Sequence, residues 1–395
     1  MALDPVQQER VTHAREAYQP PPPGNGLASV LPAALVALGT ELSDDIPETA
    51  WALPPSRAVV VVLVDGLGAT QLARRSGHAP TLRKLTQALP EKDSRCGFPS
   101  TTATSLASLG TGRCAGEHGI IGWQAGLDGG ERLFNHLAWK DGPEPASYQP
   151  LPTMLERAAE AGVRMTTVSR GKFENSGFTR AALRGGDFTP TGKAPERVTG
   201  VLDAVRPRKG APALVYAYWE DVDKVGHEFG PDSPEWGEAV EEMDAFVGAV
   251  LRGAPEGTTV VVTSDHGMVE APEHRRRDLA HGDVLGEGVR LLAGEPRAPQ
   301  VWCEPGALAD VAACWREELG EDAIVLTRDE AVEAGWFGPV LSGRAERVGD
   351  LIAAMLGEAT VLDSRLLRPE VVRLRGHHGS ITEAETRIPM LVGQA

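Results

Sequence analysis

Three strand-like runs rich in β-branched and aromatic residues, each leading into acidic residues, limit the fold of this chain more than any other feature of its sequence. The runs cover residues 58–64, 214–220 and 258–264, and they are followed by Asp65, by Asp221 and Asp223, and by Asp265-His266-Gly267. Continuous runs rich in valine and other β-branched residues are typical of strands buried on both faces of a parallel sheet. Because such sheets bind ligands beyond the carboxyl ends of their strands, we expect these acids to share one site.

Helical patterns separate the three runs. One covers residues 151–162 and another covers 233–253, where Ser233 is a good N-cap, Pro234 suits the first helical position and Gly253 ends the pattern. Strands that alternate with helices predict an α/β fold, with a mostly parallel sheet and helices on both of its faces.

The pattern changes between residues 283 and 340. Strand-like segments at 289–294, 300–304 and 323–327 surround a helical pattern at 308–319. A chain of 395 residues is long for one domain, so we expect a small α+β cap at 283–340, inserted into a core formed by 27–282 and 341–395. Residues 1–26 end in four consecutive prolines and a turn, which predict an N-terminal arm on the surface.

The charge of the chain excludes several classes of partner. Its 55 acidic and 39 basic residues give a net charge of −16, which repels a nucleic-acid backbone. It has no apolar run near the roughly 18 residues that cross a bilayer, so we expect no membrane partner. Four cysteines without a CxxC pair, and an N-terminus without a secretory apolar stretch, predict a cytoplasmic protein.

Several pairs of metal-ligating residues stand out. Asp265 and His266 are adjacent, and two histidines follow Gly376. Asp223 and His227 have the i, i+4 spacing that brings two side chains to one side of a helical turn or a compact loop. Together with Asp65 they form a pool of oxygen and nitrogen donors. Such donors suit Zn²⁺ or another borderline divalent ion such as Mn²⁺.

A hydroxyl-rich segment covers residues 98–105, with Pro99 before a series of serines and threonines. Proline followed by Ser or Thr predicts a helix start, where backbone N–H groups favour an anionic phosphate. Coordination to a metal is one way to make an alcohol a nucleophile near neutral pH. A hydroxyl beside metal-ligating clusters therefore indicates phosphoryl transfer.

The order of these motifs resembles that of the nucleotide pyrophosphatase/phosphodiesterase (type I phosphodiesterase) family of the alkaline phosphatase superfamily. The resemblance runs from about residue 59 to about residue 391. It rests on Val64-Asp65-Gly66, Pro99-Ser100-Thr101-Thr102, Thr111-Gly112 with His118-Gly119-Ile120, Asp223 to His227, Asp265-His266-Gly267 and His378-Gly379. It implies an alkaline-phosphatase-like core for residues 27–282 and 341–395.

The resemblance also implies roles for individual residues. Thr102 would be the nucleophile, one metal would be held by Asp65, Thr102, Asp265 and His266, and the other by Asp223, His227 and His378. Ser105 stands where many family members have an asparagine that contacts the phosphate, so we expect it to contact the substrate. His118 would support the nucleophile helix through a hydrogen bond.

Two positions have a competing neighbour. Asp221 could replace Asp223 as a ligand, but the DxxxH spacing favours Asp223. His377 could replace His378, but the family's ligand comes directly before the glycine. Alternation in an extended segment would turn His377 away from the site, where we expect it to be exposed.

We therefore expect a two-metal phosphohydrolase that cleaves phosphodiester or pyrophosphate bonds in small nucleotide-type substrates through a phosphothreonine intermediate. One alternative is a phosphomonoesterase or phosphonate hydrolase with the same ligands, and another is a catalytically silent metal-binding protein. The sulfatases of the superfamily need a CxPxR motif, which the segment Cys96-Gly97-Phe98 does not match.

Overall fold

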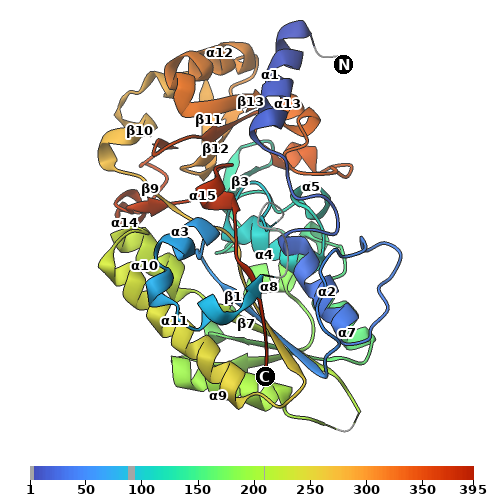
Figure 1. Cartoon of the computed structure of the whole chain (residues 1–395). Coiled ribbons are helices and arrows are strands. Elements are labelled where there is room, and N and C mark those ends of the chain that lie inside the picture. The colour runs from blue at the N-terminus through green and yellow to red at the C-terminus, as the bar shows by residue number, and fades with distance from the viewer. Residues whose placement is uncertain (1–3, 88–93, 209) are drawn as a thin grey trace.

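A seven-stranded sheet forms the centre of the protein in a computed structural model that describes residues 4–87, 94–208 and 210–395 (Figure 1). The strand order is β2-β17-β8-β1-β7-β5-β6. Five neighbouring strands run parallel, namely β1 (Ala58–Val64), β5 (Arg164–Ser169), β6 (Asp187–Pro190), β7 (Ala213–Trp219) and β8 (Thr258–Ser264). At one edge, β17 (Met390–Gln394) is antiparallel to β8 and to β2 (Thr86–Gln87).

The three predicted runs are the adjacent strands β8, β1 and β7. Val64, the last residue of β1, is in register with Trp219 of β7 and with Ser264 of β8. The residues that follow the three strands therefore leave the sheet at the same level, which explains how acids distant in sequence reach one site.

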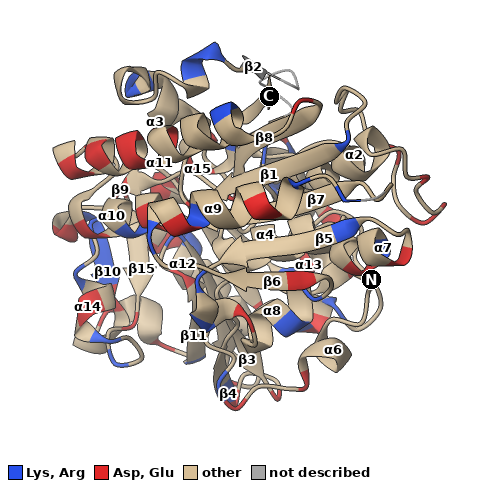
Figure 2. Ribbon diagram, turned by 90° about the horizontal axis from the view of Figure 1, so that it is seen from below, with Lys and Arg blue, Asp and Glu red and all other residues tan. Residues whose placement is uncertain are grey.

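Helices cover both faces of this sheet. On one face lie α2 (Val30–Ala37), α4 (Thr102–Thr111), α7 (Met154–Glu160) and α8 (Gly177–Ala182), and on the other lie α9 (Ala194–Val205) and α11 (Pro234–Gly253). The predicted start of α11 is correct, because Ser233 Oγ accepts a hydrogen bond from Trp236 N–H and Pro234 occupies the first helical position. Acidic residues of α11 lie along its outer side (Figure 2). The predicted α/β class is confirmed.

A second, four-stranded antiparallel sheet forms the cap in the order β11-β12-β14-β13. Its strands are β11 (Val289–Glu295), β12 (Ala298–Cys303), β13 (Ala323–Thr327) and β14 (Leu351–Met355), and it is accompanied by α12 (Leu308–Leu319) and α13 (Arg328–Glu333). The helix expected at 308–319 has these bounds. The cap extends past the expected boundary at residue 340, because β14 completes this sheet after a turn-rich connection that carries no strand pattern.

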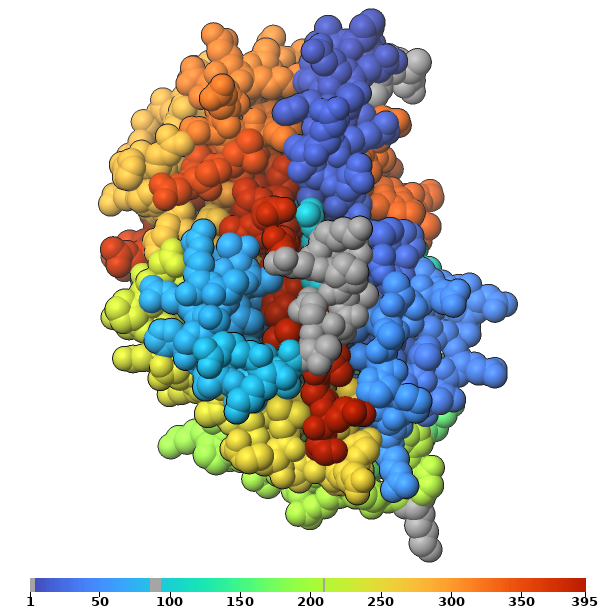
Figure 3. Space-filling model, in the orientation of Figure 1, coloured from blue at the N-terminus to red at the C-terminus, as the bar shows by residue number. Residues whose placement is uncertain are grey.

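The N-terminal segment is more ordered than the expected arm. Asp4 and Gln7 form a capping box at the start of α1 (Pro5–Ala17), which packs on the cap (Figures 1 and 3). Arg10 forms an ion pair with Glu330 of α13, and Trp336 Nε1–H donates to the Ala14 carbonyl at 3.3 Å. Residues 1–3 of the predicted arm lie outside the described residues. Within the described part of the chain, no helix combines the length and the apolar character needed to span a bilayer.

Candidate active site

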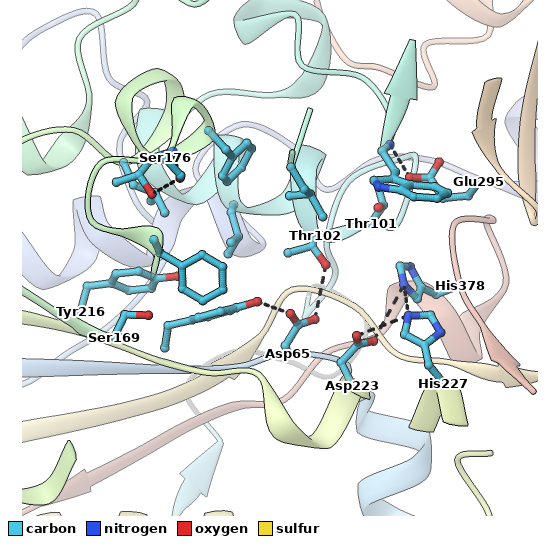
Figure 4. Close-up of a pocket in the computed structure, with 18 of the residues that line it drawn as sticks. Asp65, Thr101, Thr102, Ser169, Ser176, Tyr216, Asp223, His227, Glu295 and His378 are labelled. Carbon is cyan, nitrogen blue, oxygen red and sulfur yellow. Dashed lines mark hydrogen bonds and ion pairs between the residues drawn. The ribbon is translucent and has the colours of Figure 1, made fainter. Parts of the chain in front are cut away.

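Thr102 lies at the start of α4, beyond the carboxyl edge of the central sheet. Thr101 is the N-cap residue in an extended conformation, so Thr102 is the first helical residue. Its Oγ1 is 3.4 Å from Asp65 Oδ1 and 3.2 Å from His266 Nε2 (Figure 4). The hydroxyl-rich segment therefore does meet the residues that follow β1 and β8.

Asp65, Asp265 and His266 form one group of potential metal ligands. Their ligand atoms all lie within 4.8 Å of one another, and His266 Nε2 is 3.4 Å from an oxygen of each carboxylate. Asp265 Oδ1 accepts hydrogen bonds from the N–H groups of Gly66 and His266, at 3.1 and 3.0 Å. Its Oδ2 is buried without a hydrogen-bond partner among the described residues, which suits a metal ligand.

Asp223 and His378 belong to a second group of potential ligands that also includes His266, and His227 lies beside both of them. The helix α10 (Asp221–Phe229) presents Asp223 Oδ2 at 3.3 Å from His227 Nε2, as the i, i+4 spacing predicts. His378 Nε2 lies 3.3 Å from His227 Nε2 and 3.9 Å from Asp223 Oδ1. Asp221 instead forms an ion pair with Arg170 at 2.7 Å, outside this group.

Backbone carbonyls fix the orientation of the three histidines. The Nδ1 atoms of His227, His266 and His378 lie 2.7, 3.0 and 2.9 Å from the carbonyl oxygens of Gly376, Gly267 and Ser100, respectively. Each Nδ1 must donate to its carbonyl, so in the neutral rings Nε2 carries the lone pair. All three lone pairs are thereby directed toward the carboxylates, as in protein sites that bind metals.

The electrostatics of the cluster agree with a site for cations. Burial, together with the nearby Asp265 and Asp223, raises the pKa of Asp65 well above its usual range. Burial also raises the pKa of Asp223, and burial with the adjacent His266 and His227 lowers the pKa of His378. The acids disfavour one another's charged forms, the imidazoles do the same among themselves, and a divalent cation between them relieves the repulsion among the carboxylates. The oxygen and nitrogen donors therefore fit divalent cations.

A cavity of about 280 Å³ opens beside Thr102 and both ligand groups. Most of its wall away from them is aromatic or aliphatic, with the side chains of Leu106, Trp123, Phe173, Phe178, Leu183, Phe188, Tyr216 and Tyr218. The rings of Phe173 and Tyr218 lie 5.8 Å apart, edge to face. None of the described residues that line the cavity is a lysine or an arginine.

Ser105 does not occupy the predicted position. It is completely buried in α4 and is absent from the described wall of the cavity. Its hydroxyl lies near the Cys96 thiol and opposes the rise that burial causes in the pKa of that thiol. The shorter serine side chain thus stays within the core, and the structure offers no support for a phosphate contact.

The prediction for His118 is confirmed by the structure, whereas the prediction for His377 is not. His118 supports α4 as predicted, because its Nδ1 accepts from Ile120 N–H and its Nε2–H donates to Ser108 Oγ at 3.0 Å. His377 is buried rather than exposed, since β16 (Gly376–His377) pairs with β9 (Val269–Glu270) and encloses it. Its Nε2 lies 3.3 Å from the Leu374 carbonyl oxygen.

Two further residues of the site were not predicted. The Tyr218 hydroxyl donates to Asp65 Oδ2, and Glu295 of the cap lines the cavity and accepts from Trp123 N–H. Burial raises the pKa of Glu295 to about 7, opposed by the Thr101 hydroxyl. The position of Tyr218 near the end of an acid-bearing strand was a usable signal, whereas nothing in the sequence sets Glu295 apart from other acids of the cap.

The chain matches the model of the type I phosphodiesterase / nucleotide pyrophosphatase family over residues 59–381. It belongs to this family. A pyrophosphatase/phosphodiesterase of Schizosaccharomyces pombe that is described as uncharacterized is 27% identical over 232 residues, which cover 55% of this chain and 46% of that protein. Human ectonucleotide pyrophosphatase/phosphodiesterase family member 5 is 36% identical over 67 residues, 16% of this chain and 14% of that protein. The matches thus span half or less of these two relatives.

Solved structures of family members share the fold. Murine ectonucleotide pyrophosphatase/phosphodiesterase 5 superimposes with a TM-score of 0.66 at 19% identity, covering 85% of this chain and 87% of that chain. An inactive threonine-to-alanine variant of the same murine protein, in complex with AMP, superimposes equally well. The predicted membership of this hydrolase family and the predicted fold are confirmed.

Proposed function

We propose that this protein hydrolyses phosphodiester bonds in small nucleotide-type substrates, with Thr102 as the nucleophile. The observation that carries the proposal is the Thr102 hydroxyl, exposed to the cavity at a helix start and within 3.4 Å of both Asp65 and His266. An anionic phosphoryl group beside this hydroxyl would also face the free N–H groups of the first turn of α4.

Two divalent cations, with Zn²⁺ favoured by the donor set, complete the proposed site. Asp65, Thr102, Asp265 and His266 would hold one, and Asp223, His227 and His378 the other. When bound, such cations supply Lewis acidity and neutralise negative charge on the phosphoryl group.

In the proposed reaction, the Thr102 hydroxyl takes part in both bond-changing steps. Thr102 Oγ1 forms a bond to phosphorus as the bond to the departing alcohol breaks, and the threonine proton is balanced by the proton the alcohol gains. Water then attacks the phosphothreonine, the bond between phosphorus and Oγ1 breaks, and the hydroxyl is restored. The inactivity of the threonine-to-alanine variant of the murine relative supports an essential threonine.

The walls of the cavity favour a diester over a monoester. A monoester carries an additional anionic oxygen, and no described lysine or arginine lines the cavity to neutralise it. The Phe173 and Tyr218 rings instead offer apolar surfaces to a flat substituent such as a nucleobase. The complex of AMP with the murine relative agrees with a nucleotide substrate.

A substrate comparison tests this function. The protein, loaded with Zn²⁺ or Mn²⁺, should hydrolyse the p-nitrophenyl ester of thymidine 5′-monophosphate at a much higher kcat/KM than p-nitrophenyl phosphate or a phenylphosphonate. A preference for p-nitrophenyl phosphate would favour the phosphomonoesterase alternative. No turnover of any substrate by metal-loaded, folded protein would favour a silent metal-binding protein.

A further inference from the structure

Glu295 is a cap residue whose carboxyl group reaches the cavity of the core. It ends β11, and the hairpin to β12 is anchored by Arg297, which forms a two-point ion pair with Glu385 at 3.0 and 2.7 Å. Both charged side chains of this pair are fully buried. Glu385 Oε1 also accepts from Ser380 N–H at 3.0 Å, so the pair joins the hairpin to the segment that follows His378.

The close approach of the two segments fixes the position of Glu295. A side chain on Gly379, the residue after His378, would place its Cβ only 2.8 Å from Glu295 Cβ. Only a glycine lets the hairpin lie this near the metal-ligating segment. The position of the Glu295 carboxyl is therefore set by backbone packing and by a buried ion pair.

The carboxyl itself is only partly satisfied. Its Oε1 accepts from Trp123 N–H, whereas Oε2 is buried without a hydrogen-bond partner among the described residues, although the Thr101 hydroxyl lies near the carboxyl group. Glu295 is 4% exposed, and no described basic residue forms an ion pair with it. A buried acceptor left without a donor is costly, so this oxygen is suited to a donor that arrives with a ligand.

Glu295, with Trp123 beside it, lies at the opposite end of the cavity from Tyr216 and Ser176. Figure 4 shows Thr102 between Tyr216 and Ser176 on one side and Glu295 and His378 on the other. A phosphodiester has two substituents on its phosphorus. With phosphorus at Thr102, one substituent can enter the end with Tyr216 while the other extends toward Glu295.

We propose that Glu295 is a substrate-positioning residue that accepts a hydrogen bond from an ammonium or hydroxyl group on the substituent facing the cap. The inference rests on the proposed phosphodiesterase function and narrows its substrate class. A carboxylate attracts a cationic donor most, accepts from a hydroxyl less strongly, and disfavours a further phosphate at this end.

Three matched substrates test the inference, namely the p-nitrophenyl diesters of 2-aminoethyl, 2-hydroxyethyl and ethyl phosphate. With the Zn²⁺-loaded full chain at pH 8, kcat/KM should be highest for the 2-aminoethyl diester, by about tenfold or more over the ethyl diester, mainly through KM. The 2-hydroxyethyl diester should fall between them. Glu295→Gln keeps an acceptor for Trp123 N–H, and it should reduce the 2-aminoethyl preference to about twofold or less.

Glu304 is an exposed cap residue outside the cavity, so Glu304→Gln is the matched control and should retain the wild-type preference. Equal kcat/KM for the three diesters in the wild type would overturn the inference while leaving the phosphodiesterase function intact. A preference that survives Glu295→Gln would also overturn it. Failure of the wild type to hydrolyse any of the three would count against the proposed function itself.

Discussion

The Nε2 atoms of His227 and His378 lie 3.3 Å apart, although neither neutral ring has a hydrogen to place between them. The Nδ1 atoms donate to the carbonyls of Gly376 and Ser100, so the two lone pairs face each other. Asp223 adds a partly buried carboxylate within 3.9 Å of both rings. This arrangement is unfavourable by itself and favourable around a cation.

Chelation should abolish diester turnover and leave a folded but less stable protein, because repulsion among the buried donors is then uncompensated. Returning Zn²⁺ should raise Tm in a concentration-dependent way. At a Zn²⁺ concentration of 100 times Kd, binding should add about 2.7 kcal/mol to the free energy of unfolding. Elemental analysis, thermal unfolding and turnover measured on the same samples check this. Full turnover by protein shown to be metal-free would contradict the two-metal proposal.

Replacing the nucleophile should separate chemistry from metal binding. Thr102→Ala should lower kcat by several orders of magnitude, while the six Asp and His ligands retain most of the bound metal. Thr101→Ala should retain far more turnover, since the Thr101 side chain contacts neither Asp65 nor His266 in the described hydrogen bonds. Mass spectrometry of a trapped intermediate should find the phosphate on Thr102. Phosphate on Ser100 or Thr101 would show that the nucleophile is misassigned.

The adjacent histidines 377 and 378 provide a matched pair of substitutions. His378→Ala should reduce bound metal toward one ion per chain and reduce turnover, because it removes a ligand from the group with Asp223 and His227. His377→Gln should retain two ions, since the His377 ring contacts the Leu374 carbonyl. Metal content per chain is the deciding measurement. A larger loss of metal in His377→Gln would mean that the ligand is the preceding histidine.

The central sheet was predictable because its strands are buried on both faces. The runs at 58–64 and 258–264 have the bounds of β1 and β8, and the motifs that follow these strands meet as expected. Local patterns of this kind need no tertiary information, since a valine run has few alternatives. The i, i+4 spacing of Asp223 and His227 allowed either a helical turn or a compact loop, and the segment is the helix α10.

Features that depend on tertiary packing were not predictable. β14 joins the cap sheet only through pairing with β12 and β13, and α1 is held by contacts with α13 more than 300 residues away. Ser105 was placed by analogy with a longer side chain, and its hydroxyl stays in the core. Glu295 reaches the cavity only because the hairpin is locked to the segment after His378. The cytoplasmic location stays a prediction.

The contribution of His118 to the stability of the protein should fall as the pH drops below about 6.5. Burial and the nearby Arg344 and Arg347 lower the pKa of His118 to about 3, whereas the unfolded chain has a value near ~6.5. Above that pH, both states are neutral. Below that pH, the unfolded state binds a proton that the folded state does not bind. This difference lowers the free energy of unfolding by about 1.4 kcal/mol per pH unit until the folded state also titrates.

His118→Gln provides the test, because glutamine keeps a donor for Ser108 Oγ but does not titrate. Urea unfolding at pH 7, 6, 5 and 4 should show a shallower loss of stability in the variant than in the wild type. His136 and His377, whose pKa values are also lowered by burial, should leave a residual slope in both proteins. Parallel curves for the two proteins would show that the pKa of His118 is not lowered in the folded state.

The buried ion pair between Arg297 and Glu385 should stabilise the contact between cap and core, so removing only its cation should cost much of the free energy of unfolding. Arg297→Met leaves the Glu385 carboxylate fully buried without its cation, which should destabilise the fold by about 3–5 kcal/mol. Arg297→Met/Glu385→Gln removes that uncompensated charge and keeps an acceptor for Ser380 N–H, so the double variant should recover part of the loss. Arg132→Met, which breaks an exposed ion pair with Asp128, should cost less than about 1 kcal/mol. Urea unfolding of the four proteins measures these differences, and equal losses for Arg297→Met and Arg132→Met would show that the buried pair does not join the hairpin to the core.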